Sequence, residues 1–144
     1  RIKLAVYIKK ISIDWAVATI DNIIIDEINI LKSSHKAMTN AVKKLKIKPE
    51  LIIIDGNNFY SNIKTPHKCI IKGDNKYFSI AAASILAKTH RDQIMIKINK
   101  KHPEYNWCKN KGYPTIQHKK VIKKIGASIY HRKSFNLFGI NKDF

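Results

Sequence analysis

The chain has 144 residues and carries 28 lysines and arginines against 10 aspartates and glutamates, a formal net charge of +18. This length fits a single domain over 1–144 and excludes two, and no apolar run approaches the roughly 20 residues that a membrane-spanning helix needs. The sequence therefore predicts no membrane partner, and its positive field favours a polyanionic partner, most often nucleic acid.

In the first half of the chain, apolar periodicity and turn residues predict helices and strands in alternation. Asp26 is the expected N-cap of the second helix, whose basic last turn complements the helix dipole. The predicted elements are a helix over 1–10, a strand over 11–20, a helix from about Asp26 to Lys46, a buried strand over 50–55 and a short strand over 67–73.

The second half is expected to be mainly helical. A long helix covers 76–101, a loop rich in aromatic residues and lysines follows, and a second helix over 115–126 has Thr115 and Gly126 as its caps. The tail from 127 onward is predicted to be irregular. Strands that alternate with helices predict an α/β fold, a layered domain.

The lysine excess limits what the net charge says about the partner, and the two cysteines indicate the cellular compartment. Lysine makes up 25 of the 28 basic residues, and an AT-rich coding sequence also produces an excess of lysine, isoleucine and asparagine, so the charge alone leaves the partner open. Cys69 and Cys108 form no C-x-x-C pair. Their spacing fits neither a metal knuckle nor a disulfide framework and predicts a reducing, cytoplasmic environment.

Asp55 is the first candidate site residue because it ends an apolar strand and is followed by Gly56. Ligands of open α/β sheets bind beyond the carboxyl ends of the strands, and glycine lets the backbone turn away sharply there. The alternative is a turn aspartate that bonds its own backbone.

Asp92 is the second candidate. At about 100° per residue it falls on the side of its helix that carries Ala81, Ile85 and Ile96. An ionised carboxylate against an apolar layer needs a charge or a metal beside it. The phase favours a partner inside a cleft, and a surface pair with Lys88 or Arg91 is the alternative.

Two carboxylates that converge in a basic protein indicate Mg²⁺ or Mn²⁺, which bind carboxylate oxygens together with waters and substrate phosphates. A site with two such ions would need more carboxylates than these. Asp26 and Glu27 are rejected as the missing pair, because they open a helix, where acidic residues stabilise the terminus.

Six segments together resemble the type 2 ribonuclease H family, ribonuclease HII, and cover essentially the whole chain. They occur in the family's order as "IDEINIL", "AMTNAVKKL", "IIIDGN", "IIKGDNKYFSIAAASILAKTHRD", "YNWCKNKGYPTIQH" and "YHRKSF". The resemblance implies a ribonuclease H-like layered fold with a mixed sheet flanked by helices, and a metal-dependent endonuclease of DNA replication and repair. Its implied substrates are the RNA strand of RNA–DNA hybrids and duplex DNA with a single embedded ribonucleotide, incised on the 5′ side. A monomer is expected, although no motif in the sequence determines the oligomeric state.

The resemblance also assigns roles to individual residues. Asp55 and Asp92 match catalytic, metal-binding aspartates, and Tyr113 after Gly112 matches the tyrosine that packs on the sugar at the RNA-to-DNA junction. A core tyrosine is the alternative for Tyr113. The candidates for phosphate contact, each with a solvated or packing role as its alternative, are Lys72, Ser84, Lys88, Lys111 and Arg132.

The C-terminal part of the chain matches the family, whereas the family's N-terminal motifs are missing. The segment 115–144 is expected to be a helical and irregular region that contacts substrate. His118 in this segment is expected to have a structural role, with a functional role as the alternative. The family's "DEAGRG" strand and its "DSK" motif do not occur, so the domain is expected to be N-terminally incomplete and to lack N-terminal strands. Two functions therefore stay open: a ribonuclease H-type endoribonuclease, and a non-catalytic basic nucleic-acid-binding protein or inactive remnant of one.

Overall fold

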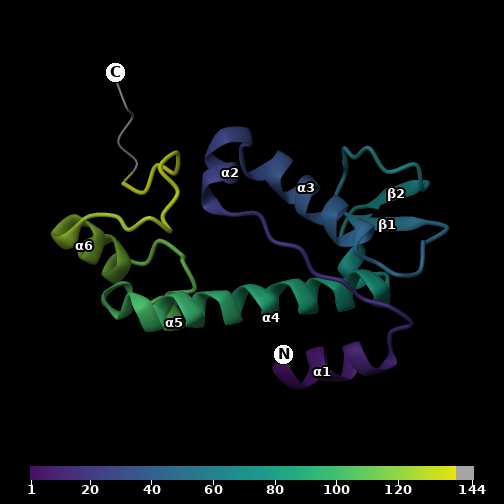
Figure 1. Ribbon diagram of the computed structural model, residues 1–144, viewed down its shortest axis with the longest axis horizontal. Coiled ribbons are helices and arrows are strands. Elements are labelled where there is room, and N and C mark those ends of the chain that lie inside the picture. Colours follow the sequence, from purple (N-terminus) through teal and green to yellow (C-terminus); the bar gives the residue numbers. More distant parts are fainter. Residues whose placement is uncertain (139–144) are drawn as a thin grey trace.

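The computed structural model describes residues 1–138, and it is a mostly helical α/β fold with a small parallel sheet (Figure 1). The predicted α/β class is confirmed. Short 3₁₀ turns lie at Gly73–Asn75 and Pro103–Tyr105. The helices and strands are α1 (Ile2–Ile11), α2 (Asn22–Ile28), α3 (Ile30–Lys43), β1 (Ile52–Asp55), β2 (His67–Ile70), α4 (Phe78–Lys101), α5 (Trp107–Asn110) and α6 (Ile116–Ile125).

The sheet consists of β1 and β2, which pair in parallel with Ile52 opposite His67 and Asp55 opposite Ile70. Ile52 and Ile54 are buried and pack with Phe59, while Asp55 at the end of the strand is exposed. Parallel strands joined by a long connection end at the same edge of the sheet. The first residues after β1 and after β2 therefore lie close together.

Helix α4 is the longest element, and other elements pack against it along its length (Figure 1). Ala5 and Ile8 of α1 form one buried cluster with Leu86 of α4. Arg1, at the start of α1, pairs with Asp92 further along α4, so the two helices run antiparallel. Since α4 contacts α1, the sheet and the C-terminal segments on different sides, it has no single apolar stripe.

The strand predicted over 11–20 is wrong, because residues 12–21 form an extended connection in which no strand is present. Val17 packs against the cluster between α1 and α4. The Asp14 carboxylate accepts hydrogen bonds from the amides of Lys46 at 2.6 Å and Ile47 at 3.2 Å. The alternating apolar residues thus anchor a connection instead of joining a sheet.

The predicted N-cap at Asp26 is also wrong. Asp21 caps α2 by accepting from the amide of Ile24 at 2.9 Å, and Asn29 caps α3 by accepting from Lys32 at 3.1 Å. Asn29 has a φ of 68°, which interrupts the single helix that the sequence predicted. Asp26 lies inside α2, and its carboxylate binds the tail of the chain instead.

The predictions for the second half are confirmed more closely. The helix expected over 76–101 is α4, and Thr115 caps α6 by accepting from the amide of His118 at 3.2 Å. Gly126 ends α6 with a φ of 83°. The last part of the predicted substrate-contact segment, 139–144, lies outside the described residues.

Within residues 1–138, no helix is both long enough and apolar enough to cross a membrane.

Gly73 provides a test of how β1 and α4 are joined. A Cβ on Gly73 would lie 2.7 Å from Ile80 Cδ1 and 3.6 Å from the Asp55 Cα, and Ile80 is buried. We expect Gly73→Ala to lower the free energy of unfolding by about 1–3 kcal/mol through overpacking, measured by urea denaturation.

The matched control removes the clashing methyl group. Ile80→Val alone should cost about 0.5–1.5 kcal/mol, and in its background the cost of Gly73→Ala should shrink. Additive costs in the double variant would contradict this packing explanation.

Candidate metal-binding and nucleic-acid-binding site

Asp55 lies at the carboxyl edge of the sheet and is held there by the segment that follows β2. Its Oδ1 accepts a hydrogen bond from the amide of Gly73 at 2.8 Å. The parallel ladder continues one residue further, with the amide of Gly56 donating to the carbonyl of Ile70 at 3.0 Å. Gly56 then turns away with a φ of 111°, so the Asp55 carboxylate stays exposed at the edge.

Asp74 is the residue that sequence reasoning missed. It directly follows Gly73, whose amide binds Asp55, and its side chain is exposed in the 3₁₀ turn Gly73–Asn75. Asp55 is the last residue of β1 and Asp74 lies four residues after the end of β2, and the carboxyl ends of neighbouring parallel strands share one edge. The "KGD" motif after a predicted strand was the available signal. Asp55 and Asp74 are called the acidic pair below.

The structure does not bring Asp92 to Asp55. Gly73 lies between Asp55 and Ile80 near the start of α4, and Asp92 follows Ile80 by twelve residues, which is about 18 Å along a helix axis. One ion with ligand distances near 2.1 Å cannot contact both carboxylates.

Asp92 instead has an arginine as its partner. Its Oδ2 lies 3.3 Å from Nη1 of Arg1, and its side chain is 32% exposed. The helical phase favoured a partner inside a cleft, whereas the partner is Arg1 at the start of α1, and both side chains are partly exposed. A partly exposed ion pair of this kind contributes about 0–1 kcal/mol.

The donor set at the sheet edge fits a hard cation. Mg²⁺ is commonly held by one or two carboxylates and completes its shell with waters and substrate phosphates. Among residues 1–138, no group of three or more histidine, cysteine, aspartate or glutamate side chains is arranged to hold a metal. Asp55 and Asp74, both exposed, are the residues at this edge that could hold such an ion.

Tyr113 lies on the loop between α5 and α6, against the middle of α4. The residue is 63% exposed, which excludes the core role. The guanidinium of Arg91 lies 5.1 Å from the centre of its ring, and Gly112 before it has a φ of 77°. An exposed, pre-oriented aromatic ring of this kind can pack against a sugar or a base.

The candidates for phosphate contact are spread along the chain. Lys72 is exposed beside the acidic pair and has a left-handed φ of 54°. Lys88 is exposed on α4, where Ser84 is half-buried. Lys111 donates from Nζ to the carbonyl of Cys108 at 2.5 Å, and Arg132 stacks 4.6 Å from the ring centre of Phe135.

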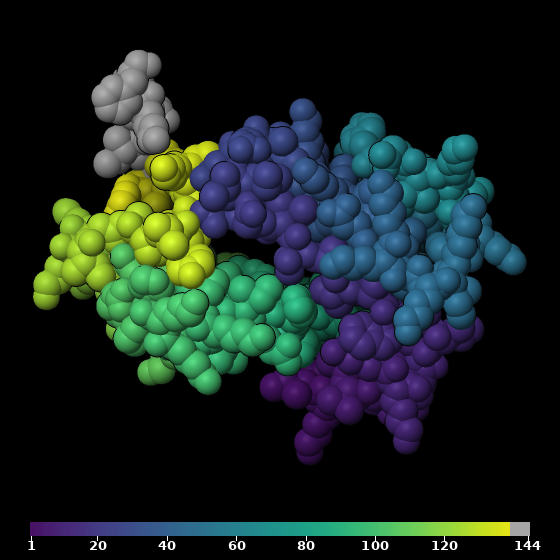
Figure 2. All heavy atoms as spheres, in the orientation of Figure 1, coloured from purple at the N-terminus to yellow at the C-terminus, as the bar shows by residue number. Residues whose placement is uncertain are grey.

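The tail is tied to α2 across the molecule. Asp26 accepts hydrogen bonds from the amides of Lys133 at 2.7 Å and Ser134 at 3.1 Å, and from the hydroxyl of Ser134. The hydroxyl bond is the main reason why the pKa of Asp26 is lowered. In the space-filling view the surface is hollowed between α2 and α4 (Figure 2). The tail contacts therefore hold Arg132 near α2.

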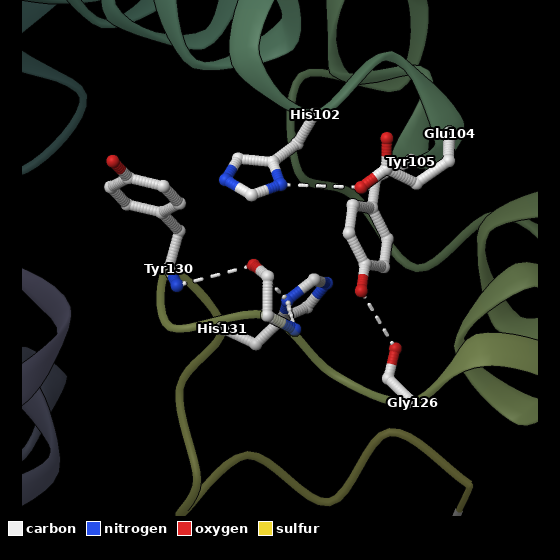
Figure 3. Close-up of polar contacts among 7 residues, drawn as sticks. His102, Glu104, Tyr105, Gly126, Tyr130 and His131 are labelled. Atoms are coloured by element: carbon white, nitrogen blue, oxygen red, sulfur yellow. Dashed lines mark hydrogen bonds and ion pairs between the residues drawn. The ribbon is translucent and has the colours of Figure 1, made fainter.

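A cluster of aromatic and histidine side chains lies between the end of α4 and the tail, and Figure 3 shows His102, Tyr105, Tyr130 and His131 of this cluster. Tyr105 and Trp107 stack with ring centres 4.9 Å apart, and the Tyr105 hydroxyl donates to the carbonyl of Gly126 at 2.9 Å. His118 is 3% exposed, and its Nε2 lies 3.3 Å from Nε2 of His131. This burial agrees with the structural role expected for His118.

One arrangement of protons satisfies the two histidines. The amide of Ser128 donates to Nδ1 of His131 at 2.9 Å, so the proton of neutral His131 is on Nε2 and points to Nε2 of His118. Nδ1 of His118 then donates to the carbonyl of Tyr105 at 3.1 Å. Burial, and then the charge of His118, lower the pKa of His131.

Together these features define the class: a basic α/β protein with two carboxylates at the carboxyl edge of its sheet and an exposed tyrosine loop on its longest helix. Residues 1–138 match the family model described as Ribonuclease HII. The chain belongs to the ribonuclease HII family, as the motifs indicated.

Individual relatives agree with this assignment, and each is named Ribonuclease HII. The chain is 62% identical to the protein of Christiangramia forsetii over 113 residues, which cover 78% of this chain and 57% of the relative. It is 49% identical to that of Bacteroides thetaiotaomicron, with 96% of this chain and 70% of the relative covered. It is 52% identical to that of Chlorobium phaeobacteroides, with 95% of this chain and 67% of the relative covered. The chain thus spans 57–70% of the length of these relatives.

The lowered pKa of His131 predicts a loss of stability in mild acid. Above the ordinary pKa of about 6.5 both folded and unfolded states are neutral at this residue. As the pH falls below 6.5, the unfolded chain takes up the proton first, so the free energy of unfolding should decrease until folded His131 also titrates. Urea denaturation between pH 7.5 and pH 5 measures this slope.

The variant for this test is His131→Asn, which keeps an acceptor for the amide of Ser128. In His131→Asn the free energy of unfolding should decrease less between pH 7.5 and pH 5 than in the wild type. In His90→Asn, on the exposed face of α4, the decrease should equal that of the wild type. A slope in His131→Asn equal to that of the wild type would show that His131 does not carry the effect.

Proposed function

We propose that the chain acts in an endoribonuclease that hydrolyses the RNA strand of RNA–DNA hybrids and incises duplex DNA at single embedded ribonucleotides. Membership of the ribonuclease HII family and the net charge of +18 support this substrate class. The observation that carries the proposal is the hydrogen bond from Gly73 to Asp55, because it joins the "KGD" turn, which contains Asp74, to the end of β1. The proposed setting is DNA replication and repair in the cytoplasm, as a monomer.

In this proposal each part of the site has one task. Asp55 and Asp74 would hold Mg²⁺ or Mn²⁺, which, when bound, polarises the scissile phosphate and activates a water for attack on phosphorus. The Gly73 amide keeps the Asp55 carboxylate oriented. Lys72, next to the acidic pair, contacts a phosphate of the cut strand, and Tyr113 packs against the deoxyribose, where a 2′-hydroxyl would change the fit.

A second candidate is a basic protein that binds such duplexes without cutting them. The observation that favours it is the small acidic pair, since residues 1–138 contain no metal-binding group of three or more side chains and two ions need more carboxylates. Both candidates share the basic, phosphate-binding surface and differ only in hydrolysis.

Metal binding tests the assignment of the carboxylates. Asp55→Asn and Asp74→Asn should each weaken Mn²⁺ binding about tenfold or more, while Asp92→Asn should bind as the wild type does, although it removes the same charge. Titration calorimetry with Mn²⁺ alone measures the three affinities, and Glu104→Gln is the control for loss of a remote charge. Weaker binding in Asp92→Asn with unchanged binding in Asp74→Asn would restore the pairing that the sequence predicted.

Incision separates the two functions. The chain is incubated with Mn²⁺ and a duplex that carries one ribonucleotide, with the all-DNA duplex as the matched substrate. We expect cutting only at the ribonucleotide, lost in Asp55→Asn and Asp74→Asn. Binding without cutting supports the second candidate. In either case log affinity should fall by about 0.9 per phosphate contact per tenfold increase in salt, and a salt-insensitive complex would contradict both.

A further inference from the structure

We propose that Asn110 and Arg91 are positioning residues that fix Tyr113 for contact with the sugar of the substrate. Asn110 fixes the backbone of the loop, and Arg91 fixes the ring. The inference rests on the proposed function of Tyr113 and adds two residues to it that touch no substrate themselves.

Asn110 joins the Tyr113 loop to the core through three hydrogen bonds. Its Nδ2 donates to the carbonyl of Tyr105 at 2.7 Å, and its Oδ1 accepts from the amide of Gly112 at 2.8 Å. Its main-chain carbonyl accepts from the amide of Tyr113 at 2.9 Å. The Asn110 side chain thus donates a hydrogen bond to the core and accepts one from the loop, and an amide side chain has both a donor and an acceptor for these bonds.

The core side of this connection is rigid. Tyr105 and Trp107 are only 4% and 3% exposed, and His118 donates to the same Tyr105 carbonyl that receives Asn110. On the loop side Lys111 has a φ of 50°, in the left-handed region that is unfavourable for a residue with a side chain, and Gly112 follows with a φ of 77°. A conformation like that of Lys111 persists only where the surroundings determine it, and Asn110 accepts hydrogen bonds from the amides of Gly112 and Tyr113, the two residues that follow Lys111.

Arg91 acts on the ring. Its guanidinium lies 5.1 Å from the centre of the Tyr113 ring, and Nη2 would lie 3.7 Å from a Cβ on Gly112. Within residues 1–138 Arg91 forms no ion pair with a carboxylate, since the neighbouring Asp92 pairs with Arg1. A cation over one face of the ring leaves its other face for a ligand.

Packing within the fold does not account for these contacts. The Tyr113 side chain is 63% exposed, so burying it contributes little to stability. Two separate residues nevertheless hold its backbone and its ring in one orientation. Ordering a contact residue before binding reduces the entropy lost on binding, which favours a role in recognition.

The first experiment measures the loop in the free protein by NMR. In the wild type we expect the amides of Gly112 and Tyr113 to be as rigid as those of α4, and the Arg91 side-chain protons to be shifted by the Tyr113 ring current. Asn110→Ala should make both amides mobile, and Arg91→Gln should change the Tyr113 ring shifts. Lys97→Gln removes the same charge from an exposed position of α4 and should change neither. An equally rigid loop in Asn110→Ala would overturn the inference.

The second experiment compares the affinities for the ribonucleotide-containing duplex and for the all-DNA duplex, without divalent metal. Tyr113→Ala should reduce the ratio of the two affinities, and Asn110→Ala and Arg91→Gln should reduce it by about twofold to fivefold. In the Tyr113→Ala background, Arg91→Gln should have no further effect on the ratio. With Tyr113 present, Arg91→Lys should keep part of the ratio that Arg91→Gln loses, because lysine retains a cation beside the ring. Lys97→Gln should leave the ratio unchanged.

The outcomes distinguish the inference from the proposed function. Equal wild-type affinities for the two duplexes would overturn the role of Tyr113 and the inference together. A wild-type preference that depends on Tyr113 but is unchanged in Asn110→Ala and Arg91→Gln would overturn the inference alone.

Discussion

The hydrogen bond from the Gly73 amide to the Asp55 carboxylate is the contact on which the arrangement of this protein depends. It joins the end of β1 to the turn that starts α4, and a side chain at position 73 would strike Ile80. The close approach of backbone to carboxylate therefore fixes both where α4 begins and where the acidic pair lies. The same contact serves the fold and the site, so a change at Gly73 cannot affect one without the other.

From that fixed start, α4 carries the remaining parts at set positions along its axis. Leu86 packs on α1, and Arg91 contacts the Tyr113 ring. Met95 and Ile98 pack on the hydrophobic cluster of Tyr105, Trp107 and Ile122. Since a helix rises about 1.5 Å per residue, the eleven residues from Ile80 to Arg91 set about 16 Å along the axis between the acidic pair and the tyrosine loop. A rigid element is suited to hold two contact points for one extended polyanion.

Local signals predicted the elements that local interactions determine. The caps of α6 and the strand β1 followed from a few neighbouring residues, whereas Asp26 and Asp92 were misjudged because their partners come from the tail and from Arg1, 107 and 91 residues away. The segment 11–20 has strand-like residues, but no strand pairs with it within residues 1–138. Asp74 was missed because only the parallel pairing of β1 with β2 shows that two strand ends share an edge. The role of Tyr113 came from the family resemblance, and its exposure was not predictable from sequence.

The charge distribution has a further consequence for how substrate and metal would bind. The net charge of +18 attracts a nucleic acid over several ångströms, but salt screens it beyond about 8 Å. At contact distance, two exposed carboxylates would repel the phosphate that must be cut, and a divalent cation between them would reverse that repulsion. Each ligand would therefore raise the affinity for the other by the same factor, because coupling between two sites is reciprocal. Within the proposed function, a lysine-rich surface and a small acidic pair are complementary: the surface provides affinity for any duplex, and the pair makes close approach of one phosphate depend on the metal.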